Sequence, residues 1–285
     1  MLAWAARNAS PGHLPGSFPA RAEVATPLWG KLRAIALLKA EQWDRAREQL
    51  ALVPPDAERT RLMGHLLVRT GHPEAAAALP GVDRRARQYL VGALLTDADV
   101  DRLAVSSDKV IRDMATFEGA VRRAHHHQWA DAITAVERSR PDRAALFRRA
   151  RDIATSQAPD GDLTWAHFLD GHDGGLFSDG DPGFYRAVSD HEERLPSGAH
   201  ERAQIRDMFM RSTERWLAIE SYTRWLVAHP RAPNARDVLD EADRAYGKLT
   251  NFGGADTFFW GRTGKSTPVI ADLLRVGAEI RRRSQ

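Results

Sequence analysis

The sequence predicts an all-α fold in which short antiparallel helix pairs stack into a solenoid. Three observations support this fold class. Apolar residues recur at intervals of three and four, as in Leu32, Ile35 and Ala36, which is the periodicity of amphipathic helices. Proline, glycine and other breakers interrupt this pattern after segments of about 10 to 18 residues, and the alternation typical of β-strands is almost absent. Similar short segments also recur along the chain.

The 285 residues divide into four expected parts. Residues 1–27 contain Pro11, Pro15 and Pro19 among glycines and serines, so we expect an irregular N-terminal arm. Residues 28–158 should form a first block of helix pairs. Residues 159–183 are rich in Asp, Gly and aromatic side chains and break the periodicity, which predicts an irregular insertion. Residues 184–285 should form a second block that ends in a capping helix.

Three short segments have the character of hairpin corners. Residues 42–46 (QWDRA) recur as residues 128–132 (QWADA), and residues 71–75 (GHPEA) lie between them. The final alanine is small enough to let two helices approach closely, and both tryptophans are expected to anchor the core. A weaker fourth copy at residues 101–104 would place the alanines 29, 29 and 28 residues apart. Such regularity favours stacked units.

The second block contains a match to a known family. In residues 218–230 a small residue is followed by an aromatic residue four positions later and a proline twelve positions later, and the next helical stretch ends in AYGKLTN. This pattern resembles the tetratricopeptide repeat, whose units are helix–turn–helix pairs of about 34 residues. The resemblance covers about residues 28–152 and 198–250. It implies a right-handed superhelix whose concave face binds a peptide or a protein.

The resemblance also implies which residues contact the partner. By matching first-helix positions, the concave face would be lined by Lys31, Lys39, Phe117, His125, Asp207 and Arg211. The chain would then be a non-enzymatic scaffold or adaptor in a larger assembly, without cofactor, metal or membrane span. A nucleic-acid partner is disfavoured because 41 basic residues are balanced by 38 acidic ones, a net charge of +3.

Two groups of potential metal ligands have simpler explanations. The acidic residues and histidine within residues 170–181 lack the alternating oxygen ligands of a calcium loop, and Asp-Gly pairs are common in turns. Residues 125–127 are three consecutive histidines, which on a helix point about 100° apart and cannot converge on one ion. The chain has no cysteine, so disulfides and thiolate sites are excluded.

Near the C-terminus, residues 258–274 contain GRTGKST, which is similar to a phosphate-binding loop. That loop requires glycine, four residues and then Gly-Lys-Ser/Thr, whereas the first glycine here, Gly261, is two residues too close. A turn explains the segment better. Ser266 or Thr267 would cap the final helix, and Pro268 would occupy its first turn.

A second enzyme hypothesis rests on Glu220 and Ser221. They are similar to the catalytic Glu-Ser pair of lytic transglycosylases, but TRWLVAHP follows them in place of the Gly-Leu-Met-Gln segment of those enzymes. Glu220 is therefore expected on an exposed helix face. The alternative function that stays open is a helical accessory domain of an envelope or glycan-processing system. A cytoplasmic location is the default expectation because the chain as written shows no export signal, with the bacterial periplasm or envelope as the alternative.

Overall fold

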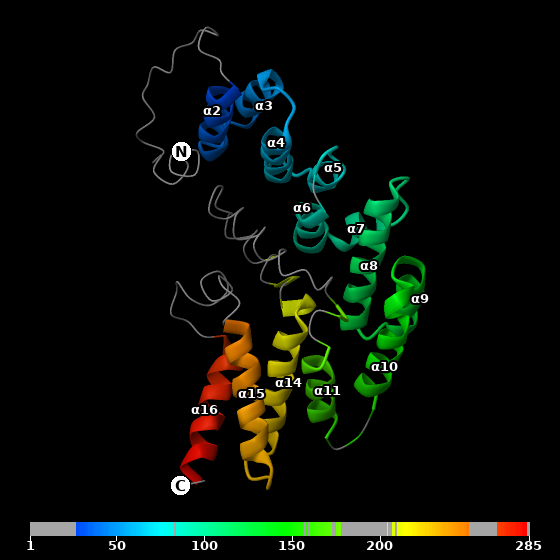
Figure 1. Ribbon diagram of the computed structural model, residues 1–285, viewed down its shortest axis with the longest axis vertical. Coiled ribbons are helices and arrows are strands. Elements are labelled where there is room, and N and C mark those ends of the chain that lie inside the picture. The colour runs from blue at the N-terminus through cyan, green and yellow to red at the C-terminus, as the bar shows by residue number, and fades with distance from the viewer. Residues whose placement is uncertain are drawn as a thin grey trace. The chain divides into compact units, whose positions relative to one another are not determined.

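The computed structural model describes residues 27–82, 84–156, 158, 160–172, 175–177, 204, 207, 208, 210–250 and 267–283. Within these ranges every regular element is a helix, which confirms the all-α fold class (Figure 1). In chain order the elements are α2 (Pro27–Lys39), α3 (Trp43–Leu52), α4 (Ala57–Arg69), α5 (Pro73–Ala77), α6 (Arg84–Tyr89), the π-helix η2 (Leu90–Leu94), α7 (Asp97–Leu103), α8 (Lys109–His125), α9 (Trp129–Ser139), the 3-10 helix η3 (Pro141–Arg143), α10 (Ala144–Ala154), α11 (Gly161–Asp170), α14 (Glu214–Ala228), α15 (Ala235–Thr250) and α16 (Pro268–Arg283). Among these described helices, none is both long enough and apolar enough to cross a bilayer.

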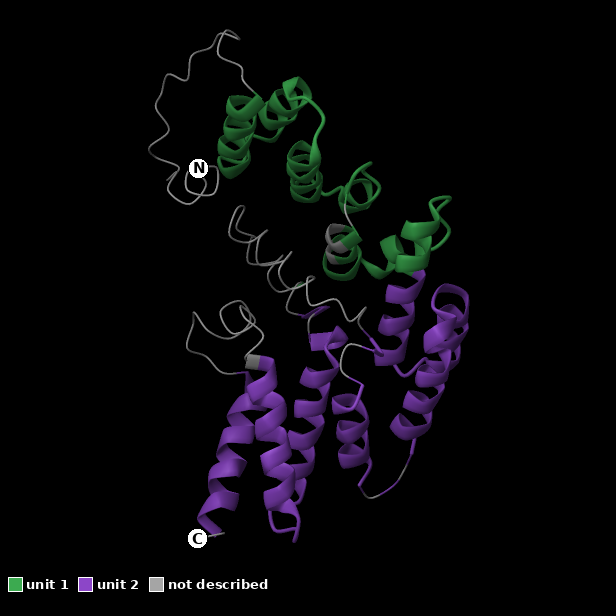
Figure 2. Ribbon diagram, viewed as in Figure 1, with its two compact units in different colours: residues 1–115, 186–204 green, residues 116–185, 205–285 purple. Residues whose placement is uncertain are grey.

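The helices belong to two compact units (Figure 2). Unit 1 comprises residues 1–115 and 186–204, and unit 2 comprises residues 116–185 and 205–285. This division differs from the expected blocks, which meet at residues 159–183. Aromatic side chains from α8, α10, α11 and the following turn pack into the same core as α14, so these segments join the C-terminal helices in unit 2.

In unit 1, the first helices pack in succession: α2 contacts α3, α3 contacts α4, and α4 contacts α5. Their core contains Ala34, Leu38, Leu50 and Leu62, each at most 2% exposed. Trp43 is only partly buried at the edge of this core, so the expectation that it is a central anchor is wrong. Trp43 packs against this cluster from outside, whereas Ala46 and Leu50 of the same helix are buried within it.

In unit 2, α14 is the central helix. It lies between α11 and α15 in Figure 1 and contacts α11, α15 and α16. Its Trp216, Ile219 and Leu226 are fully buried. The expectation of an irregular insertion is wrong for α11. This helix forms because Ala166 and Leu169 lie three residues apart on one apolar face, and that face is buried in the core.

Three helix corners share one backbone geometry. Two residues before the second helix of each pair, the backbone has a positive φ, at Glu41 (56°), Gly71 (80°) and His127 (59°). The next amide donates to a carbonyl five residues earlier, from Gln42 to Leu37 (2.9 Å), from His72 to Leu67 (2.7 Å) and from Gln128 to Arg123 (2.8 Å). These are the bonds of a Schellman-type helix end. The three recurring segments therefore mark genuine, equivalent corners.

The geometry changes the register of the second copy. The alanines that are fully buried at the corners are Ala46, Ala76 and Ala132, whereas Ala75 is exposed. When the corners are aligned by their backbone geometry, Gly71 therefore corresponds to Glu41, whereas the sequence match had aligned it with Gln42. The proposed fourth copy is wrong, because Ala104 follows the last residue of α7 instead of lying inside the second helix of a pair.

The final helix begins as predicted. Pro268 is the first residue of α16, and the Thr267 hydroxyl accepts a hydrogen bond from the Ile270 amide at 3.4 Å. Ile270 and Ile280 lie on its buried face, whereas Leu274 is 58% exposed. The glycines and lysine of GRTGKST lie outside the described residues, as does most of the N-terminal arm.

Candidate functional site

The six residues that the family resemblance implies are divided between the two units. Lys31 and Lys39 belong to unit 1 and the other four to unit 2. The Lys31 ammonium forms an ion pair with Asp56, the N-cap of α4. Burial lowers the pKa of Lys39 below its usual range. Asp207 is exposed.

Phe117 does not line a free surface. Its ring is 9% exposed and contacts Phe147 edge-on, with 6.3 Å between centroids. The guanidinium carbons of Arg140 and Arg143 lie 5.6 and 5.2 Å from the centroid of the Phe117 ring. The implied contact role of Phe117 is therefore wrong, because the side chain belongs to the core of unit 2.

His125 and Arg211 meet in a polar cluster at the C-terminal half of α8. Arg211 Nη2 donates to Glu118 Oε1 at 3.0 Å, and Arg122 Nε donates to the same oxygen at 2.8 Å. His125 Nε2 lies 2.5 Å from the Arg211 carbonyl oxygen, and since a carbonyl only accepts, Nε2 carries the hydrogen. Phe177 contacts the imidazole with 5.0 Å between centroids.

The environment of His125 favours its neutral form. Burial is the main cause, and the positive charge of Arg211 adds to it; together they lower the pKa of His125 to about 4. The cluster thus ties α8 to the residues just before α14. Sequence reasoning missed Glu118: its spacing to Arg122 is a visible i, i+4 pair, but nothing local points to Arg211, 93 residues further on.

Glu214 is a second acidic residue that sequence reasoning missed. Its side chain lies in the first turn of α14 and the residue is 1% exposed. Oε1 accepts hydrogen bonds from the amides of Leu176 (2.9 Å) and Phe177 (2.6 Å). The carboxylate therefore fixes the turn after α11 against α14.

Glu220 is half-buried, which corrects the expected exposed position. Burial raises the pKa of its carboxyl, while the Trp216 indole N–H donates to Oε1 at 2.8 Å and opposes the rise. Ser221 is buried and accepts a hydrogen bond from Arg224 Nη2 at 2.9 Å. Both members of the Glu-Ser pair thus bond to residues of their own helix.

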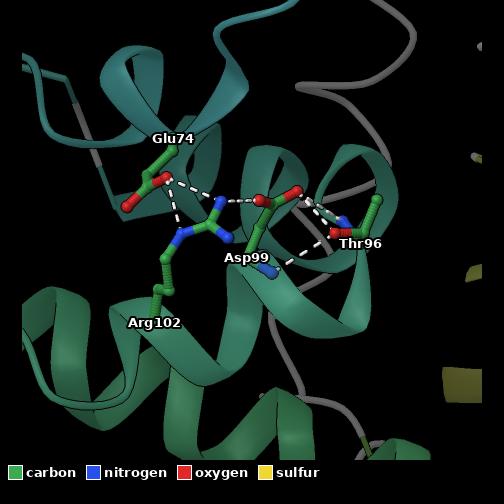
Figure 3. Close-up of polar contacts among 4 residues, drawn as sticks. All are labelled: Glu74, Thr96, Asp99 and Arg102. Carbon is green, nitrogen blue, oxygen red and sulfur yellow. Dashed lines mark hydrogen bonds and ion pairs between the residues drawn. The ribbon is translucent and has the colours of Figure 1, made fainter.

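In unit 1, an exposed ion-pair network links α5 to α7 (Figure 3). Arg102 Nη2 lies 3.2 Å from Glu74 Oε2 and also pairs with Asp99. Asp99 and Thr96 form a capping box at the start of α7, and the hydrogen bond from the Thr96 hydroxyl is the main cause that lowers the pKa of Asp99. The charges pair with one another, so we assign this network to helix packing.

An open pocket of about 400 Å³ is lined by the turn between α14 and α15 and by the end of α16. These ends of the three helices lie at the bottom of Figure 1. Its lining consists of Pro230, Arg231, Ala232, Pro233, Ala235, Arg236, Ile280 and Arg283. Three of these residues are arginines and none is acidic. Sequence reasoning missed this pocket, because residues 230–236 and Arg283 are far apart along the chain.

The three arginines differ in their partners. Arg231 is exposed and has no hydrogen-bond or ion-pair partner among the described residues. Arg236 Nε lies 3.3 Å from Asp240 Oδ1, and Arg283 Nη2 lies 2.5 Å from Glu279 Oε1. The pocket thus presents positive charge on an apolar floor, which suits an anionic group with an apolar stem.

No protein-family model, curated protein or solved structure matches this chain. The resemblance to the tetratricopeptide repeat therefore stays a prediction from the motifs quoted above.

Proposed function

We propose that this chain is a non-enzymatic interaction module, an adaptor that binds a protein partner as part of a larger assembly. Its helix pairs would stack as a right-handed, tetratricopeptide-like solenoid. Two features support the stacking: the three corners share one backbone geometry, and α16 packs on α14 as well as on α15. Contact between alternate helices is how successive units of a helical solenoid bury their apolar faces.

The observation that carries the proposal is the arginine-lined pocket. It gathers exposed charge of one sign at the helix ends, where a partner can reach it. Other ionisable side chains serve another purpose: those of the buried Glu214 and the partly buried Glu118 and His125 each bond to another segment of unit 2. These polar groups hold helices together, whereas the pocket arginines are exposed and one of them, Arg231, has no partner among the described residues.

Co-purification tests this function. The full chain, tagged and recovered at physiological salt, is expected to bring down a protein partner in fixed stoichiometry, which size-exclusion chromatography with light scattering would measure. Recovery of the chain alone as a monomer would contradict the adaptor role. Co-recovery of an envelope or glycan-processing enzyme as the partner would instead favour the alternative, a helical accessory domain of such a system.

A further inference from the structure

We propose that the arginine-lined pocket binds an acidic segment of the partner protein, in which carboxylate side chains alternate with small apolar ones. This inference rests on the proposed function and deepens it, since it names the contact site and the chemistry of the partner. Three properties of the pocket support it: its charge, its apolar floor and the acids that surround it.

The charge of the lining is available to a ligand. Arg231 has no hydrogen-bond or ion-pair partner among the described residues, so a carboxylate can pair with it without breaking an existing bond. The ion pairs of Arg236 and Arg283 are i, i+4 contacts whose side chains are 36–46% exposed, and such pairs are weak in water. A guanidinium has five N–H donors, so both arginines keep donors for a second carboxylate.

The floor of the pocket is apolar and held in place. Pro230 and Pro233 have fixed φ angles. The Ala232 amide donates to the His229 carbonyl at 3.1 Å, and the Ala235 amide donates to the Ala232 carbonyl at 3.0 Å. A preformed turn loses little conformational entropy on binding. Small apolar side chains of a peptide would contact this floor while its carboxylates reach the arginines.

The surroundings favour a peptide over a nucleic acid. Asp237, Asp240 and Glu279 flank the lining, so the positive charge is confined to the pocket and does not form the one-sided basic surface typical of a nucleic-acid site. The lining contains no aromatic side chain on which a base could stack. The positive N-terminal end of α15 is opposed there by the negative C-terminal ends of α14 and α16, so the arginines and not the helix dipoles provide the attraction.

Fluorescence anisotropy tests the inference with the full chain and a short labelled peptide that alternates glutamate and alanine. We expect this peptide to bind at least about tenfold more tightly than a peptide in which glutamine replaces each glutamate. Its binding should become weaker as added salt screens the charges. Arg231→Glu should weaken binding about tenfold or more. The matched control is Arg275→Glu, because Arg275 is exposed on the same helix as Arg283, pairs with Asp272 and does not line the pocket.

Three results would overturn the inference: equal binding of the glutamine peptide, equal loss in the Arg231→Glu and Arg275→Glu variants, or tighter binding of a labelled single-stranded DNA that Arg231→Glu abolishes. Thermal melts monitored by circular dichroism verify that both variants are folded.

The pocket assignment and the adaptor role can fail separately. If a natural partner co-purifies with the Arg231→Glu variant as well as with the parent chain, the pocket assignment is wrong and the adaptor role stands. If the peptide binds as expected but no partner co-purifies, the pocket assignment stands without the adaptor role.

Discussion

At the scale of single residues, the left-handed position of each helix corner determines which side chain it tolerates. Gly71 has a φ of 80°, and a Cβ there would meet no other atom, so only backbone strain opposes a side chain. We expect Gly71→Ala to lower the free energy of unfolding by about 1 kcal/mol. Glu41→Gly and His127→Gly should raise it by up to about 1 kcal/mol, because they remove that strain.

Chemical denaturation would measure these effects, with Gly247→Ala as the control. Gly247 lies inside α15, has no positive φ, and has open space around its Cβ position. There the same substitution should stabilise by about 0.5–1 kcal/mol. A loss of stability in Glu41→Gly and His127→Gly would contradict the assignment of the corners.

His125 predicts a pH dependence at the same scale. Its pKa is about 4 in the folded chain against 6.5 for a free histidine, so below pH 6.5 the unfolded chain binds a proton that the folded chain does not. Its stabilising effect is full above pH 6.5 and is lost as the pH falls toward 4, by at most about 1.4 kcal/mol per pH unit. Unfolding curves between pH 7 and 4 should show this slope.

Variants isolate the histidine from other titrating groups. Glu220, whose pKa is raised, acts in the opposite direction, and the lowered pKa of Asp56 and Asp99 matters only at lower pH. His125→Gln should flatten the slope, whereas His126→Gln, at an exposed neighbour, should leave it unchanged. Equal slopes in the parent and His125→Gln would show that this imidazole is not buried.

At the scale of elements, the tryptophans at two of the corners, Trp43 and Trp129, should contribute unequally to stability. Trp129 is 6% exposed at the start of α9 and contacts Trp165 edge-on, so Trp129→Ala should cost about 3–5 kcal/mol of unfolding free energy. Trp43 is only partly buried, and Trp43→Ala should cost clearly less. The buried Trp129 indole N–H has no hydrogen-bond partner among the described residues, so Trp129→Phe should be milder than Trp129→Ala. Equal costs for the two alanine variants, measured by denaturation, would contradict this ranking.

At the scale of the whole molecule, the two units differ in their cores. The cluster of α2, α3 and α4 is small, whereas α14 has residues such as Trp216 and Leu226 that are fully buried in a much larger cluster. Because local stability follows buried apolar contact, we expect amides of α2 to exchange with deuterium faster than those of α14 under native conditions. Mass spectrometry of peptides from each helix would measure this. Equal protection in α2 and α14 would mean that the chain unfolds as one cooperative body.

The predictions that were confirmed depend on short-range signals. Apolar spacing of three and four residues indicated the helices, and Thr267 with Pro268 indicated the start of α16. The predictions that failed needed distant contacts. Asp and Gly residues typical of turns surround α11, and the contact with α14 that buries its apolar face lies far away along the chain. Phe117 was placed by analogy with a repeat position, but its neighbours Phe147, Arg140 and Arg143 bury it.

The sequence by itself determined the class of this protein: its helical periodicity, its corner segments and its nearly balanced charge can all be read within a few residues of each position. Only the tertiary structure decided the register of the second corner, the division into two units, and the meeting of Arg231 and Arg236 with Arg283 in one pocket. The physical reason is range. Propensity and capping act over one or two helical turns, whereas burial and pocket geometry depend on side chains that the fold brings together from distant parts of the chain.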